Sequence, residues 1–199
     1  MTNPTLVNYQ FPELPIPERL LALVGEAPGS EEVKELQPFV GRSGLLLNDH
    51  LKTAGIERSR CLVANVFRVQ PPDNNVGYFF ASRARSRRLG VELLEHMGRF
   101  GGLGYCLAIF SSEIAALQQA LIALNPQVII ALGRTPLWAL TGLDGILKCR
   151  GEVQTCRMLP GAQVIPTYHP SYLLRGNRRL EPMFQSDLAL AASLIRQSP

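Results

Sequence analysis

The chain lacks the features that mark secreted, membrane-embedded and disulfide-stabilised proteins. Its four cysteines are scattered and form no Cys-x-x-Cys pair, so neither a disulfide framework nor a metal site built from cysteine alone is expected. No apolar run approaches the ~20 residues that a membrane-spanning helix requires. The N-terminus carries prolines in place of a basic segment followed by a long apolar one, unlike a signal peptide. We therefore expect a cytoplasmic protein.

Two common phosphate-binding loops are also missing. The sequence contains neither a Gly-x-Gly-x-x-Gly turn nor a Gly-Lys-Ser/Thr loop, which are typical of dinucleotide-binding and P-loop proteins. A nucleotide-binding α/β protein unrelated to DNA is therefore the least favoured interpretation.

The composition is that of a folded domain with a sizeable core. Of the 199 residues, 46% are hydrophobic and 18% are charged, which excludes a disordered chain. The net charge is +4, and arginines concentrate at 83–88 and again at 175–179. This distribution is compatible with a polyanionic partner.

Apolar runs that suit buried strands alternate with helical patterns along the chain. We expect strands at about 20–25, 61–67, 128–132 and 164–168, with a β-ribbon around 147–158. Helices are expected from near Ser43, which can cap the first, from 111 or 112 to Pro126, after Gly133 and after Pro182, with a short one at 89–97. This alternation predicts an α/β fold: a three-layer α/β/α sandwich with a central four-stranded parallel sheet. We expect one domain over 1–199, with an extended arm at 1–19 and an insertion at 76–110.

Each strand that ends in a polar loop delivers a distinct chemical group. Glu26 follows the first strand, Asn65 ends the second, and His169 follows the fourth. Because the carboxyl ends of parallel strands share one edge, these side chains can converge there. Together with Phe39 they suit a small planar heterocycle, although singly Asn65, Phe39 and His169 also fit ordinary turn, core and loop positions.

Five motifs together resemble the uracil-DNA glycosylase superfamily, and most closely its bacterial and archaeal family 4, whose members carry an iron–sulfur cluster. They are Gly25-Glu26-Ala27-Pro28-Gly29, the run from Pro38-Phe39-Val40-Gly41 to Asn48, Ala64-Asn65-Val66 before Pro71-Pro72, Ala131-Leu132-Gly133, and His169-Pro170-Ser171-Tyr172-Leu173-Leu174-Arg175. The resemblance covers residues 20–75 and 125–197.

The resemblance implies hydrolysis of the N-glycosidic bond of a deoxyuridine flipped out of DNA. It gives catalytic roles to Glu26, which would position or activate water, and to His169, which would stabilise charge on the uracil oxygen. The implied base-binding residues are Gly25, Ala27, Pro28, Gly29, Glu32, Phe39 and Asn65, with Glu32 crowding the C5 side of the base. The implied DNA-binding residues are Gly41, Arg42, Ser43, Gly44, Ser171, Leu173, Leu174 and Arg175, the last three as wedge and clamp.

The chain departs from the family pattern in three places. No cysteine precedes Cys61, Val69 stands at the family's third cluster position, and Leu117 stands approximately at the fourth. We therefore expect no iron–sulfur cluster and no metal. The segment 76–110 is longer than its family counterpart, and Val33 and Leu36 change the loop Ser30–Gln37 beside the base.

These departures leave alternatives open. One is a glycosylase specific for a bulky 5-modified pyrimidine, and another is a catalytically silent DNA-binding module of the same fold. The retention of Glu26, Asn65 and His169 argues against the silent module, because binding alone needs none of them. We expect DNA as the partner, no membrane association and a monomer.

Overall fold

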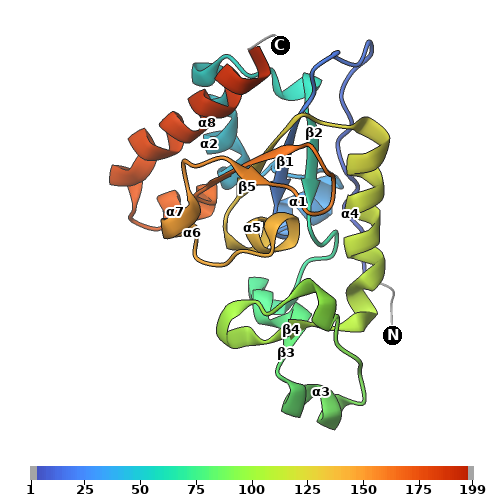
Figure 1. The fold of residues 1–199 in the computed structure, drawn as a ribbon. Coiled ribbons are helices and arrows are strands. Elements are labelled where there is room, and N and C mark those ends of the chain that lie inside the picture. The colour runs from blue at the N-terminus through green and yellow to red at the C-terminus, as the bar shows by residue number, and fades with distance from the viewer. Residues whose placement is uncertain (1–3, 197–199) are drawn as a thin grey trace.

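The computed structural model describes residues 4–196 and is built around one five-stranded sheet (Figure 1). The strand order is β2-β1-β5-β7-β6. The strands are β1 Leu21–Gly25, β2 Leu62–Asn65, β5 Val128–Leu132, β6 Gln154–Thr155 and β7 Gln163–Thr167. The first four in this order pair in parallel, and β6 pairs antiparallel with β7.

The four predicted parallel strands are confirmed, and the sheet has one strand more than predicted. That strand, β6, comes from the segment 147–158 that was expected to form a ribbon, and it covers the outer edge of β7. The register aligns Gly25 with Asn65 and Leu132 with Thr167. Val24 pairs with Ala131 across β1 and β5, so all four parallel strands finish level with one another and form a single rim.

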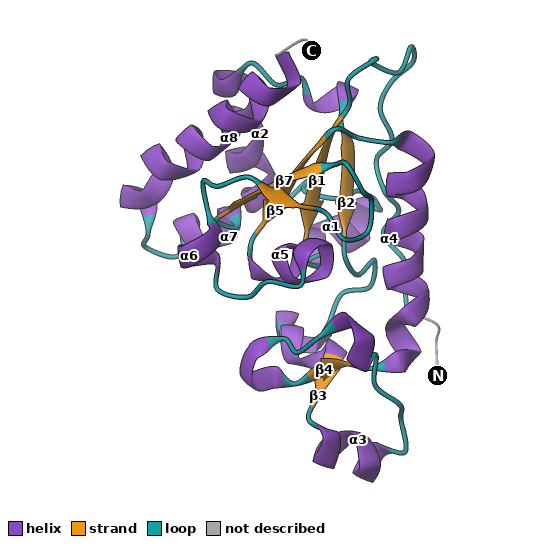
Figure 2. Ribbon diagram, in the orientation of Figure 1, coloured by secondary structure: helices purple, strands orange, loops and turns teal. Residues whose placement is uncertain are grey.

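Helices cover both faces of the sheet, as Figure 2 shows. α2 (Arg42–Ala54), α7 (Pro170–Leu174) and α8 (Glu181–Arg196) pack on one face, and α4 (Ser111–Leu124) and α5 (Arg134–Thr141) pack on the other. The remaining helices, α1 (Ser30–Glu35), α3 (Arg83–Leu89) and α6 (Ile146–Cys149), lie in connections. The predicted three-layer sandwich is confirmed.

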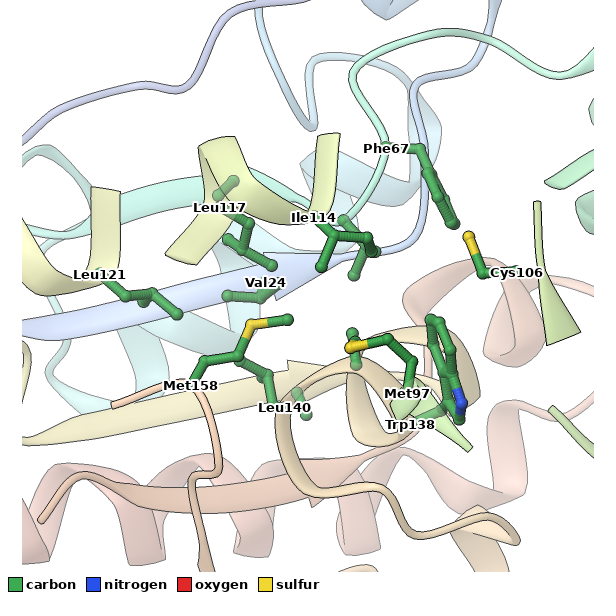
Figure 3. Close-up of a cluster of buried hydrophobic side chains, with 14 of the residues drawn as sticks. Val24, Phe67, Met97, Cys106, Ile114, Leu117, Leu121, Trp138, Leu140 and Met158 are labelled. Carbon is green, nitrogen blue, oxygen red and sulfur yellow. The ribbon is translucent and has the colours of Figure 1, made fainter. Parts of the chain in front are cut away.

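Alternation along β1 divides the core into two layers. Ala22 and Val24 face the layer under α4 and α5, whereas Leu21 and Leu23 face the layer under α2 and α8, as expected when successive strand residues point to opposite faces. Figure 3 shows the first layer, where Val24 lies among Leu117, Met158 and neighbouring apolar side chains. Strands buried on both faces explain why their sequences read as continuous apolar runs.

The N-terminal arm pairs with the sheet, which is more than the surface contact expected for it. The backbones of Gln10 and Val63 exchange hydrogen bonds of 2.9 and 2.8 Å, and Val7 is buried. This short antiparallel contact covers the exposed edge of β2, which would otherwise present unpaired backbone groups.

A buried ion pair joins the arm, the loop after β2 and the start of α4. Arg68 donates two side-chain hydrogen bonds to Glu113, of 2.9 and 3.0 Å, and its backbone N–H donates a third of 2.8 Å. The Arg68 guanidinium also lies 5.7 Å from the centre of the Tyr9 ring in the arm.

The insertion at 76–110 folds around a two-stranded antiparallel sheet, β3 (Phe80–Ala81) with β4 (Tyr105–Cys106). Stacked rings, with Phe67 and Phe79 at 3.7 Å between centroids, fix it to the core. The helix expected at 89–97 is wrong. The chain forms α3 six residues earlier, from the cap Ser82 to the left-handed Gly90, and only a short 3₁₀ turn follows at Glu95–Met97.

A smaller difference concerns the start of α2. α2 begins at Arg42 with Gly41 as its cap, so Ser43 lies inside the first turn and does not cap the helix.

Across residues 4–196, no helix has the length and apolar character needed to cross a membrane. The division into one domain with an arm and an insertion stays a prediction, and residues 1–3 of the arm lie outside the described chain.

Replacing Glu113 with Gln should destabilise the fold. It leaves the Arg68 guanidinium without its counter-charge, and breaking a buried ion pair costs about 3–5 kcal/mol. Because the Arg68 side chain is 22% exposed, we expect a loss of about 2–3 kcal/mol in the free energy of unfolding. Urea denaturation followed by fluorescence of Trp138 measures it.

The matched control is Glu31→Gln, which breaks the exposed pair with Lys34 in α1. No measurable change is expected there, because exposed pairs contribute little. Equal effects of the two substitutions would contradict a structural role for the Arg68–Glu113 pair.

Candidate active site

The candidate site lies at the rim where the parallel strands end. β1 leads into Glu26, β2 ends in Asn65, β5 leads through Gly133 to Thr135, and β7 leads to His169. The convergence predicted for Glu26, Asn65 and His169 follows from the register, because Gly25 pairs with Asn65 across β1 and β2. The centroids of the Phe39 and His169 rings are 5.9 Å apart, so the aromatic side chain belongs to the same place.

Phe39 is held in a backbone conformation that residues other than glycine rarely adopt. Its φ is +54°, and such strain is found where surrounding contacts determine it. Two glycines provide the space: a Cβ at Gly25 would lie 2.4 Å from Phe39 Cζ, and one at Gly44 would lie 1.8 Å from the Phe39 carbonyl oxygen. Glycine is therefore required at both positions for the ring to lie across the rim.

Arg58 holds the Phe39 backbone in place, a role that the sequence did not suggest. Its guanidinium donates to the carbonyl oxygen of Phe39 at 2.8 Å and to the Asn48 side chain at 2.9 Å. It also donates to Gln10 of the arm. Burial lowers the pKa of Arg58 from its ordinary value. Phe39 is thus connected to the arm through one arginine.

The Asn65 side chain is nearly buried and free to read a ligand. It is 4% exposed, and no residue within 4–196 forms a hydrogen bond with its amide. Its Oδ1 packs against the open face of Gly25, 2.4 Å from where a Cβ would be. An amide placed in this way presents one acceptor and two donors to a heterocycle edge.

His169 is held as a neutral imidazole with a defined tautomer. The backbone N–H of Ser171 donates to Nδ1 at 3.1 Å, so Nδ1 is an acceptor and the ring proton lies on Nε2. Burial, together with the positive charge of Arg175, lowers the pKa of His169 to about 4. At neutral pH the ring therefore offers an uncharged N–H donor.

Glu26 is paired with a residue that sequence reasoning missed. Thr135, fully buried at the first turn of α5, donates its hydroxyl to Glu26 Oε2. Burial raises the pKa of the Glu26 carboxyl, whereas the hydrogen bond from Thr135 and the charges of Arg175 and Arg134 lower it. The only sequence signal for Thr135 is its place two residues beyond the Gly133 that ends a buried strand.

In the structure Glu32 connects two loops through hydrogen bonds, and its predicted contact with the base stays a prediction. Its carboxylate accepts backbone N–H groups from Gly29 at 3.1 Å, Val40 at 3.1 Å and Gly41 at 2.9 Å. These bonds connect the Glu26 loop to the Phe39 loop and use both carboxylate oxygens. Ala27 and the buried Pro28 lie in the same braced loop.

The predicted DNA-binding groups divide into those that are available and those that are not. The first helical bond of α2 runs from the N–H of Leu45 to the carbonyl of Gly41, so the N–H groups of Arg42, Ser43 and Gly44 precede it and remain available for an anion. The Gly41 N–H is occupied by Glu32.

On α7, Leu173 cannot act as a wedge because it is fully buried among the residues under α2 and α8. Leu174 is half-buried, and the exposed large side chains of this segment are Tyr172 and Arg175. Arg175 donates to the Ser171 carbonyl at 3.2 Å, which keeps its charge beside His169.

Comparison with known proteins agrees with this geometry. A family model described as the Uracil DNA glycosylase superfamily matches residues 11–190. The chain belongs to this superfamily. It is 35% identical to a Type-4 uracil-DNA glycosylase of Thermotoga maritima over 182 residues, 89% of this chain and 78% of the relative.

Two archaeal proteins of the same printed name show similar coverage. The identity is 32% to the protein of Pyrobaculum aerophilum, over 84% of this chain and 74% of the relative. It is 28% to that of Archaeoglobus fulgidus, over 84% and 72%. The placement near family 4 is therefore confirmed.

The residues present do not fit the iron–sulfur cluster typical of family 4. Cys61 lies in the core layer under α2 and α8, whereas Cys106 and Cys156 lie in the layer on the opposite face of the sheet. Burial raises the pKa of Cys61 and of Cys106 to about 12, so both are neutral thiols within the apolar core. Within residues 4–196, no three His, Cys, Asp or Glu side chains are grouped to hold a metal.

Apolar packing occupies the two expected ligand positions. Val69 is 6% exposed and Leu117 is fully buried, and both belong to the core layer under α4 and α5. A superfamily member with this sequence therefore has hydrophobic contacts at positions where its relatives' pattern places cysteine.

Substituting Thr135 with Val should raise the pKa of Glu26. The change keeps the shape of the side chain and removes the hydroxyl donor that favours the ionised carboxylate, so the carboxyl loses its proton at higher pH. The carboxyl ¹³C shift of Glu26, followed through a pH titration, measures this.

Thr141→Val in the same helix is the control, because the Thr141 hydroxyl donates to the Leu137 carbonyl outside the site. It should leave the Glu26 midpoint unchanged. An unchanged or lowered midpoint in Thr135→Val would show that the hydrogen bond does not hold the carboxylate.

Proposed function

We propose that the chain is a uracil-DNA glycosylase that hydrolyses the N-glycosidic bond of a deoxyuridine flipped out of DNA. The observation that carries this proposal is the convergence of Glu26, Asn65, His169 and Phe39 at one rim. The superfamily match and the printed names of the relatives support the same reaction. Released uracil and an abasic site in the DNA are the products.

Recognition begins with extrusion of the base, since its glycosidic bond is inaccessible within the duplex. The flipped ring stacks on Phe39, whose position is fixed by Gly44 and Arg58. The Asn65 amide then donates to and accepts from the edge of uracil. Gly25 leaves room for both contacts because it carries no side chain.

Bond cleavage separates charge, and the site has groups for both parts. As the C1′–N1 bond breaks, the sugar gains oxocarbenium character and uracil leaves as an anion. The Nε2–H of His169 donates to a uracil oxygen as negative charge develops there. A neutral donor suits this step, because its hydrogen bond strengthens with the charge and no proton need be transferred.

Glu26 acts on the water that completes the reaction. Its ionised carboxylate accepts a hydrogen bond from water, directs the oxygen to C1′ and removes a proton as the C1′–O bond forms. That proton finally neutralises the uracil anion. Thr135 orients the carboxylate from the other side.

The remaining assignments follow from this function. We propose that the first-turn amides of α2, with Ser171 and Arg175, bind phosphates next to the flipped nucleotide. The enzyme would act in the cytoplasm as a monomer on DNA. It would contain no cluster, since Val69 and Leu117 supply packing at the expected ligand positions.

Removing either catalytic group should abolish most turnover. We expect Glu26→Gln and His169→Ala each to lower the single-turnover excision rate by about 10²–10⁴-fold, the usual contribution of a positioned base or charge-stabilising donor. DNA affinity should change little. The assay is alkaline cleavage of a uracil-containing duplex at saturating enzyme.

Duplexes with 5-hydroxymethyl- or glucosylated pyrimidines complete the assay. If only a modified duplex is cleaved, the substrate is that modified base and not uracil. Equal, negligible product from wild type and both variants at equal affinity would indicate a DNA-binding protein without turnover.

The pH dependence of the rate reports on Glu26. Its carboxylate must be ionised to act on water, and burial raises its pKa, so the rate should fall as pH drops through that value. Thr135→Val removes a contact that lowers this pKa, so the acid limb should move to higher pH. His169 has a pKa of about 4, so its ring stays uncharged well below pH 7. If the acid limb of the pH–rate profile is unchanged in both Glu26→Gln and Thr135→Val, it reports the titration of another group.

A further inference from the structure

The insertion lies beyond the same rim as the candidate site. The chain enters it from the carboxyl end of β2 and leaves it into α4, which carries the chain back to the start of β5. Because β2 and β5 both run parallel to β1, the insertion begins and ends on the side where the strands end. Figure 1 shows this segment, with α3 at its far end, below the sheet on the side of α5.

Several contacts hold the insertion against α5 and the strand connection after it. The Trp138 indole donates to the Gly98 carbonyl at 3.2 Å, and Arg157 donates to the Met97 carbonyl at 2.8 Å. The Arg134 guanidinium lies 4.3 Å from the centre of the Phe100 ring. The insertion is therefore fixed relative to the rim.

Most of the excess positive charge of the protein lies on this segment. Residues 76–110 contain five arginines and two glutamates, a net charge of +3 out of +4 for the whole chain. Arg83 pairs with Glu95 at 2.8 Å, and Arg99 lies 6.0 Å from the Tyr105 ring. The other three, Arg85, Arg87 and Arg88, are exposed, and no carboxylate of residues 4–196 pairs with them.

Local hydrogen bonds define the inner face of the helix that carries these arginines. The Ser82 hydroxyl caps it by accepting the Arg85 N–H, and the buried Ser86 hydroxyl donates to the Val91 carbonyl at 2.6 Å. Ser86 therefore faces inward, and its neighbours Arg85, Arg87 and Arg88 face solvent. α3 contains no acidic residue.

We propose that Arg85, Arg87 and Arg88 form a second phosphate-binding surface, which contacts the DNA duplex flanking the nucleotide at the rim. This rests on the proposed function. Duplex DNA presents one negative charge per ~1.7 Å of its axis, so a basic group held beyond the active-site rim meets phosphates outside the lesion. Unpaired exposed arginines suit such contacts, because phosphate binding positions a protein without requiring a base sequence.

The test compares R85A/R87A/R88A with a control that has the same net charge. The control is K52A/R60A/R196A, three exposed cations at the other end of the sheet, around Gly55. Affinity for long uracil-containing duplexes is measured from 50 to 200 mM salt. A duplex of only a few base pairs around the uracil is measured in parallel.

The α3 variant should lose about 10–100-fold affinity for the long duplex and reduce the slope of log K against log salt by about 2–3, since each lost phosphate contact removes ~0.9. The short duplex should bind wild type and variant equally, and single-turnover excision at saturation should be unchanged. Equal salt slopes for wild type, α3 variant and control would overturn the proposal. Absence of excision by wild type would refute the proposed function instead, while the binding comparison would still judge the surface.

Discussion

The contact on which the site depends is the packing of the Phe39 ring and the Asn65 amide against the bare Cα of Gly25. Phe39 Cζ and Asn65 Oδ1 would each lie 2.4 Å from a Cβ at Gly25, which is closer than a real Cβ can approach. The strand register places Gly25 beside Asn65, and the strained Phe39 backbone brings its ring across both. The proposed stacking and edge recognition therefore share one glycine, and Glu26, the proposed catalytic residue, is the next residue along the chain.

Much of this could be predicted because the signals are local. Continuous apolar runs identified the four parallel strands, and the polar residue at each strand end identified Glu26, Asn65 and His169. The missed residues act through contacts that have no local pattern. Thr135 and Arg58 reach the site only after β5 and the turn before β2 are in place. The wrong role for Leu173 has a related cause, since its burial depends on α2 and α8.

Other contacts occur around the positions where the family pattern places cluster cysteines. The arm, the loop after β2 and the start of α4 meet at Arg68 and Glu113, with Tyr9 stacked over the guanidinium. Val69 beside this pair and Leu117 in α4 continue the junction into the hydrophobic core. Ionic and apolar contacts together therefore join these three segments.

The shortness of α5 has a thermodynamic consequence. Within its eight residues, Thr135 holds Glu26, Arg134 stacks on Phe100, and Trp138 holds the Gly98 carbonyl. Because one two-turn helix makes all three contacts, a movement of the insertion that shifts α5 would also shift the hydrogen bond to Glu26. Linkage between the two is then reciprocal: whatever free energy a ligand at the insertion exerts on the carboxylate, protonation of that carboxylate exerts on the ligand.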